Sequence, residues 1–440
     1  MQSPLRRVRP DQDYFLLRAE WLRFKSHLFD PGTDLPTLAA VLDDVRRLLE
    51  TRGALGLVYL DLAGNARIEA LHGWQAYDEL LAAFARSLRT LPRDLIGPRD
   101  VVAVPSVRSD KFLVFLEGDS VRPLDASSLE ATAERLRTTL LSAMPAQAPR
   151  FPPTSLYLGR CLIYRDPMLR TERSIHRALD AAVRESLRQR SREEGDSAQE
   201  LDGIIQAQRI DVVFQPIVNL EDGTLLGHEV FVRGPAGGSF ENPERLFAAA
   251  ERTGRLLALE RLCRQRVFLS LRRHLPPGAK LFLNTSARTL RDPEIAGADF
   301  LRQIAAQGLG RTDVVLEITE RVALRDRDSC SDALRRLKRE GIGIAVDDMG
   351  AGYSSLQAIV ALEPDYLKFD VSLVRNIDRS QIKRSLLETL VDLARRIGAR
   401  IIAEGIEAES EMATLREMGV HFGQGRHLAP PRAVLERSSL

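Results

Sequence analysis

Short apolar runs alternate with longer amphipathic stretches along the second half of the chain, which predicts strands separated by helices. Strands joined by helices pair in parallel, in an open sheet or a closed barrel, and eight of them suit a closed β/α barrel. The predicted strands are Val212–Val218, Leu225–Val232, Lys280–Asn284, Val314–Ile318, Ile342–Asp347, Tyr366–Phe369, Arg400–Glu404 and a weaker Val420–Gly423.

The first half also alternates between helix and strand patterns. Its predicted strands are Leu57–Leu62, Val101–Val104, Phe112–Glu117 and Ser155–Tyr164. An amphipathic stretch precedes them, and a polar run, Arg190–Glu200, follows a helix that begins near Thr171. The sequence therefore predicts four segments: an N-terminal helical segment (1–34), an α+β domain (35–189), a linker (190–203) and a barrel domain (204–440).

Polar side chains stand at or just after the ends of the barrel strands. They are Glu229, Asn284, Glu317, Asp347, Lys368, Glu404 and Gln424. The C-terminal ends of barrel strands share one mouth, where such residues are typical of an active site. Asp347 and Asp348 are adjacent carboxylates, which repel each other unless a cation lies between them. For this stretch alone, the alternative is a plain Asp-Asp-x-Gly turn at the surface.

The donors at these strand ends favour a hard cation. Glu229, Asn284, Glu317 and Asp347 offer only oxygen atoms, which suit Mg²⁺ or Mn²⁺ better than zinc or copper and leave calcium open. Because Asp348 and Glu404 lie near Asp347, a second ion about 4 Å from the first is reasonable. Two such ions are suited to the hydrolysis of a phosphate ester.

Lys368 is unusual because arginine far outnumbers lysine in this chain. Its compact ammonium suits contact with a nucleophilic water or a phosphate oxygen, where a guanidinium would be too wide. The alternative is a lysine paired with Asp370 at the rim of the barrel.

Eight ordered motifs give the chain a specific resemblance to the EAL family, over about residues 200–435. They are Phe214-Gln-Pro-Ile-Val218, Gly227-His-Glu-Val-Phe-Val-Arg-Gly-Pro235, Leu283-Asn-Thr-Ser286, Leu316-Glu-Ile-Thr-Glu320, Asp347-Asp-Met-Gly-Ala-Gly-Tyr-Ser-Ser-Leu356, Leu367-Lys-Phe-Asp370, Glu404-Gly-Ile-Glu407 and Gly423-Gln-Gly425. The resemblance implies a TIM-like barrel that opens cyclic di-GMP to linear pGpG with Mg²⁺ or Mn²⁺.

The resemblance also implies a role for each matching residue. Glu229, Asn284, Glu317 and Asp347 would bind the first ion, and Asp347 and Asp348 the second; Glu404 would assist the water, Lys368 would orient it, Arg233, Gln215 and Gln424 would bind substrate, and Glu320 would anchor the loop after the paired aspartates. The expected catalytic residues are therefore Glu404, Lys368 and Asp347.

Two motifs depart from the family pattern. The Glu-Ala-Leu signature reads Glu229-Val-Phe231, and the loop reads Asp347-Asp-Met-Gly-Ala-Gly352. We expect these changes to affect turnover and regulation more than ligand binding. Two hypotheses follow: a metal-dependent cyclic di-GMP phosphodiesterase, or a catalytically impaired cyclic di-GMP receptor that signals to a protein partner.

The first half resembles a GGDEF-type nucleotide cyclase domain at Leu60-Asp-Leu62, His72-Gly73 and Asp78-Glu-Leu80. Its signature loop reads Arg108-Ser-Asp-Lys-Phe112, without the glycines that let backbone approach a nucleotide, and Lys111 replaces an acidic residue. A degenerate, non-cyclising domain is expected. It would sense GTP, pair two chains as a homodimer, or clamp the barrel.

Composition agrees with two soluble domains. The 440 residues, 44% of them hydrophobic, are enough for two cores, and a net charge of +2 argues against a DNA or RNA partner. Cys161, Cys263 and Cys330 show no CxxC spacing and suit a reducing cytosol. No export signal and no apolar run of about 20 residues is present, so a cytoplasmic protein without membrane insertion is expected.

Overall fold

Two compact units make up the chain, Met1–Glu193 and Glu194–Leu440. The computed structural model describes residues 28–62, 66–118, 124–147, 155–271, 275–286, 289–292, 294, 297–319, 327–349, 359 and 362–433. The predicted helical segment 1–34 falls mostly outside these residues.

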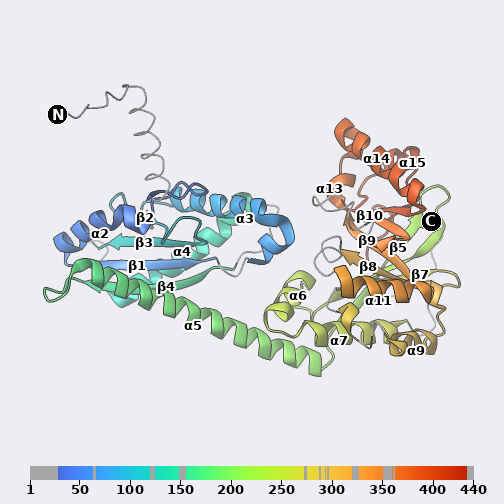
Figure 1. Cartoon of the computed structure of the whole chain (residues 1–440), viewed down its shortest axis with the longest axis horizontal. Coiled ribbons are helices and arrows are strands. Elements are labelled where there is room, and N and C mark those ends of the chain that lie inside the picture. Colours follow the sequence, from blue (N-terminus) through green and yellow to red (C-terminus); the bar gives the residue numbers. More distant parts are fainter. Residues whose placement is uncertain are drawn as a thin grey trace, which may run out of the picture. The chain divides into compact units, whose positions relative to one another are not determined.

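The first unit is a four-stranded antiparallel sheet with helices on both faces (Figure 1). Its strands are β1 (Ala54–Asp61), β2 (Val101–Ala103), β3 (Lys111–Glu117) and β4 (Tyr157–Tyr164), in the order β2-β3-β1-β4. Its helices are α2 (Leu38–Arg52), α3 (Ala66–Arg89), α4 (Ala126–Gln147) and the first part of α5 (Thr171–Gln206).

Side chains of β1 alternate between the two faces of the sheet, and both faces are covered by helices. Val58 and Leu60 pack with α3 and α4, whereas Leu57 and Tyr59 pack with α2 and α5. All four predicted strands are present with shifted ends. The hairpin between β2 and β3 carries the signature loop predicted at Arg108–Phe112.

Helix α5 continues through the segment predicted as a linker. It is helical from Thr171 to Gln206, so residues 190–203 do not form an irregular connection. The run contains no proline, and an i,i+4 bond from Gln189 Nε2 to Glu193 Oε1 (3.1 Å) supports the helix. Polar composition here indicates a solvated helix surface. The domain boundaries themselves stay a prediction.

The second unit is a closed eight-stranded TIM-like barrel, in the order β10-β11-β12-β5-β6-β7-β8-β9. Its strands are β5 (Asp211–Asn219), β6 (Leu225–Arg233), β7 (Lys280–Asn284), β8 (Val314–Thr319), β9 (Gly343–Met349), β10 (Tyr366–Phe369), β11 (Arg400–Ala403) and β12 (Phe422–Gly423). The α/β barrel predicted from the sequence is confirmed.

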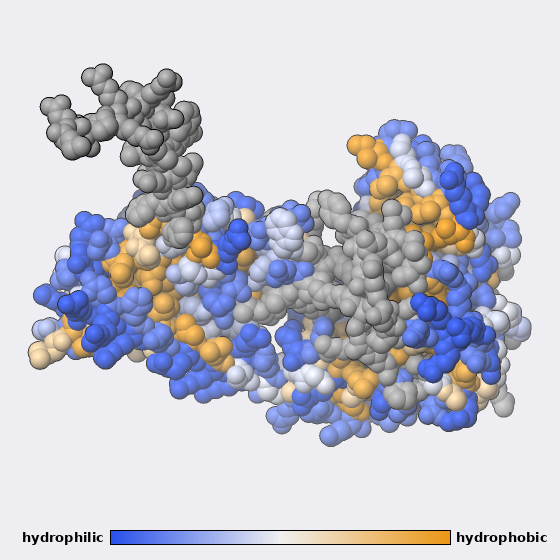
Figure 2. All heavy atoms as spheres, in the orientation of Figure 1, coloured by the Kyte–Doolittle hydropathy of each residue, from blue (hydrophilic) through white to orange (hydrophobic). Residues whose placement is uncertain are grey.

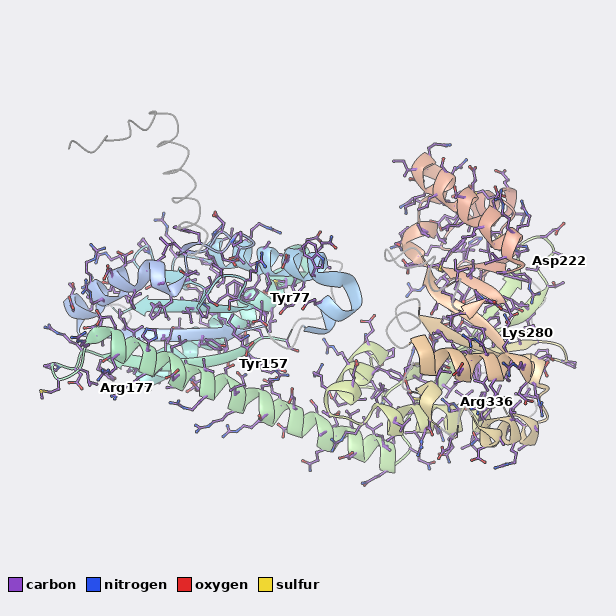
Figure 3. The ribbon with its side chains drawn as sticks, viewed as in Figure 1. Tyr77, Tyr157, Arg177, Asp222, Lys280 and Arg336 are labelled. Carbon is purple, nitrogen blue, oxygen red and sulfur yellow. The ribbon has the colours of Figure 1, made fainter. Side chains whose placement is uncertain are left out.

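One strand differs from the parallel arrangement that was expected. β5 runs antiparallel to both of its neighbours, β6 and β12. The reason is local, because a tight turn joins β5 to β6 where a parallel pair would need a long crossover. Gly223 adopts φ 71° in this turn, and Asp222 Oδ1 accepts a hydrogen bond from Thr224 N (2.9 Å; Figure 3).

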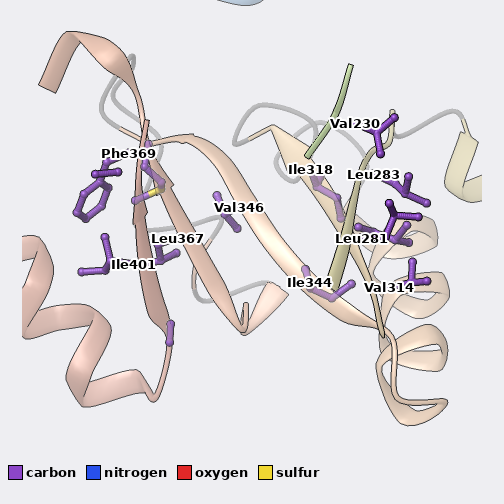
Figure 4. Packing of buried hydrophobic residues seen from close by; sticks show 14 of the residues in the cluster. Val230, Leu281, Leu283, Val314, Ile318, Ile344, Val346, Leu367, Phe369 and Ile401 are labelled. Carbon is purple, nitrogen blue, oxygen red and sulfur yellow. The ribbon is translucent and has the colours of Figure 1, made fainter. Parts of the chain in front are cut away.

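Helices surround the barrel and bury its outward-facing side chains. They are α6 (Pro243–Arg252), α7 (Leu256–Ser270), α9 (Ala298–Ala306), α11 (Arg327–Arg339), α13 (Val371–Val374), α14 (Gln381–Ile397) and α15 (Glu409–Glu417), with short 3₁₀ turns η2 (Thr289–Arg291), η3 (Arg311–Asp313) and η4 (Ile377–Arg379). Figure 4 shows part of this outer core, including Ile344, Val346 and Leu367.

The inward-facing side chains form two layers. The lower layer is apolar and consists of Ile217, Phe282, Val315, Ala345, Tyr366, Ile402 and Phe422. Strand side chains alternate, so residues two positions nearer the mouth also point inward. Those positions are Gln215, Asn284, Glu317, Asp347, Lys368, Glu404 and Gln424. A polar layer therefore lies directly above an apolar one.

Two surface features complete the description. Apolar side chains reach the surface on α14, where Ile382 is 84% exposed and Leu386 46% (Figure 2). Among the described residues, no helix is both long and apolar enough to cross a membrane.

Candidate functional site

Lys368 is the centre of the polar layer. Its side chain is fully buried, and its Nζ lies 2.9 Å from Glu229 Oε2, 2.7 Å from Glu317 Oε1, 3.3 Å from Asp347 Oδ1 and 2.6 Å from Glu404 Oε1. These carboxylates come from β6, β8, β9 and the residue after β11. The barrel thus gathers around one ammonium four of the acidic residues predicted at the strand ends.

Charge within this cluster is unbalanced, because one ammonium faces four carboxylates. Burial raises the pKa of Glu317 well above its ordinary value, and the neighbouring Glu229 raises it further. Burial also raises the pKa of Glu404. For Lys368, burial opposes the charged form, but the surrounding carboxylates, Asp347 first, hold its pKa well above the ordinary value. The carboxylates of the cluster therefore outnumber its one ammonium, which favours the binding of a further cation.

Several buried oxygen atoms in this layer accept no hydrogen bond. They are both carboxylate oxygens of Glu317, Asp347 Oδ1 and Gln424 Oε1. Lys368 approaches Glu317 and Asp347 as an ion pair without the geometry of a hydrogen bond to them. Buried polar atoms normally have partners, and two of these oxygens, Glu317 Oε1 and Asp347 Oδ1, have only the ammonium beside them, so a cation that joins or displaces it would find ligands here.

Amide side chains extend the layer around the carboxylates. Asn284 Nδ2 donates to Glu229 Oε1 (3.2 Å), which leaves its own carbonyl oxygen for another contact. Gln424 Nε2 donates to Gln215 Oε1 (3.0 Å), and Gln215 Nε2 donates to the carbonyl of Ala429 (3.0 Å). The part played by Ala429 was not predicted, because a backbone carbonyl leaves no sign in the sequence.

Other predicted site residues lie at a strand end or outside the described residues. Arg233 ends β6, four residues beyond Glu229, and is exposed. The backbone of Asp348 belongs to β9, but its side chain lies outside the description, as do Glu320 and residues 350–358. The roles predicted for the second ion and for the loop anchor therefore stay predictions.

The donor set of the polar layer fits a hard metal ion by its chemistry more than by its present geometry. In the described part of the chain, no three Asp, Glu, His or Cys side chains are arranged to hold an ion as they stand. The four carboxylates converge on the Lys368 ammonium. Their chemistry nevertheless fits a hard divalent cation, because the donors are all oxygen and three carboxylate oxygens are buried without a hydrogen bond.

The two simpler alternatives are wrong. Asp347 is buried within β9, which continues to Met349, so it does not belong to a surface turn. Lys368 does not pair with Asp370, whose side chain caps α13 by accepting a hydrogen bond from Ser372 N (2.8 Å).

A family comparison agrees with this site. The model of the EAL domain matches residues 198–431, more than half of the chain. The chain belongs to the EAL family.

Two curated relatives carry cyclic di-GMP phosphodiesterase in their names. The "Probable cyclic di-GMP phosphodiesterase PdeG" of Escherichia coli (strain K12) is 32% identical over 230 residues, which cover 51% of this chain and 45% of that protein. The "Bifunctional diguanylate cyclase/cyclic di-GMP phosphodiesterase MucR" of Pseudomonas aeruginosa is 25% identical over 445 residues of alignment, or 94% of this chain and 62% of that protein. The chain spans less than two thirds of either relative.

Solved EAL structures share the fold. The Xanthomonas citri FimX EAL domain in complex with c-diGMP matches with a TM-score of 0.52 and 18% identity, covering 57% of this chain and all of that one. Vibrio cholerae LapD, described as S helix-GGDEF-EAL bound to c-di-GMP, matches with a TM-score of 0.51 and 16% identity over 94% of this chain and 98% of that one.

Proposed function

We propose that this protein is a metal-dependent phosphodiesterase that hydrolyses cyclic di-GMP to linear pGpG. The observation that carries the proposal is the polar layer inside an EAL-family barrel, with four carboxylates around one buried lysine and three carboxylate oxygens left without hydrogen bonds. Relatives named as cyclic di-GMP phosphodiesterases support the substrate.

Two ions, Mg²⁺ or Mn²⁺, would be held by Glu229, Asn284, Glu317, Asp347 and Asp348. When bound, the ions would polarise the phosphodiester and help a water molecule to ionise. The remaining members of the polar layer are the amides Gln215 and Gln424, the amine of Lys368 and the carboxylate of Glu404, which pairs with that amine.

Glu404 and Lys368 would serve the attacking water. Their charged groups are 2.6 Å apart, so the ammonium fixes the direction of the carboxylate, and the carboxylate can take the proton that the water loses. Arg233 would contact a phosphate of the ligand from the end of β6, while Gln215 and Gln424 would hold the substrate deeper in the mouth.

A cyclic di-GMP receptor without turnover is the second candidate. One observation favours it: the carboxylates converge on an ammonium, in an arrangement that as it stands does not hold a metal ion. In this case the ligand-bound shape of the protein would be recognised by a protein partner.

Hydrolysis and binding measured side by side separate the two candidates. We expect wild type to form pGpG with Mn²⁺ or Mg²⁺ and to form none in EDTA. Glu229→Ala should abolish the product, while Lys111→Ala, in the first unit, should leave it nearly unchanged. Equilibrium binding in EDTA with no product at high enzyme and either metal would select the receptor.

For the first unit we propose a degenerate, non-cyclising GGDEF-like domain. Its hairpin loop is occupied by the chain's own groups: Arg108 adopts φ 57°, its N–H donates to Asp30, and the ammonium of Lys111 pairs with Asp110. MucR and LapD, whose descriptions include a cyclase or a GGDEF domain, align with nearly the whole chain and support this reading. GTP binding there and a homodimer complete the proposal; GTP that neither binds nor alters hydrolysis would remove the sensor role.

A further inference from the structure

Glu411 is a buried carboxylate outside the polar layer. It lies in α15 and is 5% exposed. Its Oε1 accepts a hydrogen bond from the backbone N–H of Asn376 (2.8 Å), and its Oε2 accepts from Glu407 N (2.9 Å) and Ala408 N (3.2 Å). One side chain thus satisfies three main-chain donors that belong to two different loops.

These two loops begin at the strand ends that carry the central pair of the site. Asn376 lies in the segment that follows β10, whose third residue is Lys368. Glu407 and Ala408 follow β11, three and four residues after Glu404. Glu411 therefore joins the segments that follow Lys368 and Glu404, whose charged groups lie 2.6 Å apart.

Other contacts between the same loops are weaker or depend on close packing. Arg375 pairs with Glu407, but both side chains are about half exposed, and such surface pairs contribute little. Gly405 has φ 68°, and a Cβ built there would lie 2.5 Å from Val371 Cγ2, so the loops also touch directly. Asn376 itself adopts φ 57°, an uncommon conformation that a specific partner helps to hold.

A simple helix cap does not account for all of this geometry. The spacing of Ala408 and Glu411 is that of a capping box, and the bonds from Glu407 and Ala408 serve the start of α15. The bond from Asn376 comes from another segment and adds nothing to that cap. Glu411 was not predicted from the sequence; its place three residues after Ala408 matches only the glutamate position of a capping box, because alanine has no side-chain acceptor.

We propose that Glu411 is a positioning residue that fixes Lys368 relative to Glu404. The proposal rests on the function proposed above for its effect on turnover. Its effect on the geometry of the pair can be measured without activity.

Glu411→Gln isolates the bond between the loops. An amide has one acceptor oxygen, which we expect to face the two donors at Glu407 and Ala408, so that the NH₂ group faces Asn376 N and that bond is lost. Ser380→Ala is the matched control, because Ser380 caps α14 through Lys383 N without joining these loops. We expect kcat to fall about 10-fold to 100-fold in Glu411→Gln with KM nearly unchanged, and neither to move in Ser380→Ala.

A second measurement reads the pair directly. The chain has six lysines, so ¹⁵N labelling of lysine side chains gives few ammonium signals, and Lys368 is assigned as the signal missing from Lys368→Met. In metal-free protein this signal should shift in Glu411→Gln and stay in place in Ser380→Ala. A shift in a protein that forms no pGpG would reject the proposed function and keep the positioning role. An unmoved signal, or a kcat equal to wild type in an active enzyme, would overturn the positioning role.

Discussion

The ammonium of Lys368 neutralises only part of the charge that surrounds it. Four carboxylates lie within 3.3 Å of Nζ, and the lysine side chain is fully buried. Removing one partner from a buried ionic group leaves the remaining charges without compensation, which is more damaging than the loss of a surface pair. Lysine is thus both a structural counter-ion and a candidate catalytic group.

Lys368→Met should lower the free energy of unfolding of the metal-free protein by about 3–5 kcal/mol. Added Mn²⁺ should restore part of the loss, because it supplies positive charge to the same carboxylates. Thermal unfolding in EDTA and in Mn²⁺ measures both effects. Lys280→Met, which removes a surface bond to the carbonyl of Thr312, is the control; an equal loss in both variants would contradict the prediction.

Buried His228 should make the stability of the folded barrel depend on pH. It is 2% exposed, its Nδ1 has no hydrogen bond, and burial lowers the pKa of its imidazole to about 4. In the unfolded chain the pKa returns to about 6.5. The unfolded state therefore binds a proton first, and the stability due to neutral His228 is present above pH 6.5 and lost as the pH falls toward 4.

His228→Leu should remove this acid sensitivity. Relative to the variant, metal-free wild type should lose on the order of 3 kcal/mol of unfolding free energy between pH 6.5 and 4. Urea unfolding at a series of pH values measures the difference. A curve for His228→Leu that runs parallel to wild type would refute the assignment.

At the level of elements, β6 and β7 approach each other closely at Gly227. A Cβ on Gly227 would lie 2.1 Å from the carbonyl oxygen of Lys280, so no side chain fits there. Gly227 is two residues before Glu229, which faces the same side of the strand. The glycine therefore sets the strand spacing beneath a site residue.

Gly227→Ala should destabilise the barrel by at least about 1–3 kcal/mol and reduce hydrolysis, since β6 must move away from β7. Gly195→Ala provides the opposite case. Gly195 lies within α5 with open space around its Cα, so alanine there should stabilise the protein by about 0.5–1 kcal/mol. Chemical unfolding of both variants tests the pair, and a neutral Gly227→Ala would show that the strands can separate freely.

Element type was predicted from the sequence, but the direction of one strand and the continuity of one helix were missed. The eight barrel strands were found because their apolar runs are bounded by helices and turns. The reversed direction of β5 was missed, although the six residues between the first two predicted strands are too few for a parallel crossover. The helical state of residues 190–203 was missed because a polar run is typical of a linker. A helix with a solvated surface has the same composition.

For the whole molecule, two independent cores imply two separable responses. The first unit buries side chains on both faces of its sheet, and the second around its barrel. Divalent ions proposed to bind the polar layer would stabilise only the folded barrel by mass action.

Mn²⁺ at about 100 times its Kd should stabilise the second unit by about 2.7 kcal/mol and leave the first unit unchanged. Hydrogen exchange of the full chain measures both units in one experiment. Amides of β7 to β11 should gain protection, and those of β1 and β3 should not. Equal gains in both units would indicate a general effect of the salt, and no gain in the barrel would argue against a metal site there.

The site was predictable as a set of residues, but its internal contacts were not. Strand-end position and motif order singled out Glu229, Glu317, Asp347 and Glu404, and the structure brings them together. That they all turn toward Lys368 depends on side-chain direction in three dimensions. The contacts of Gln215 with the carbonyl of Ala429 and of Glu411 with Asn376 involve main-chain atoms, which every residue has.

The reversed direction of β5 decides where the chain enters the barrel. Asp211, the first residue of β5, pairs with Arg233, the last residue of β6. The chain therefore enters the barrel at the mouth, and β5 runs from there toward the apolar layer. In a barrel of parallel strands alone, the incoming chain would arrive at the opposite end. The segment that connects α5 to β5 therefore meets the barrel at the end that holds the polar layer, and a displacement of this segment would act first on that end.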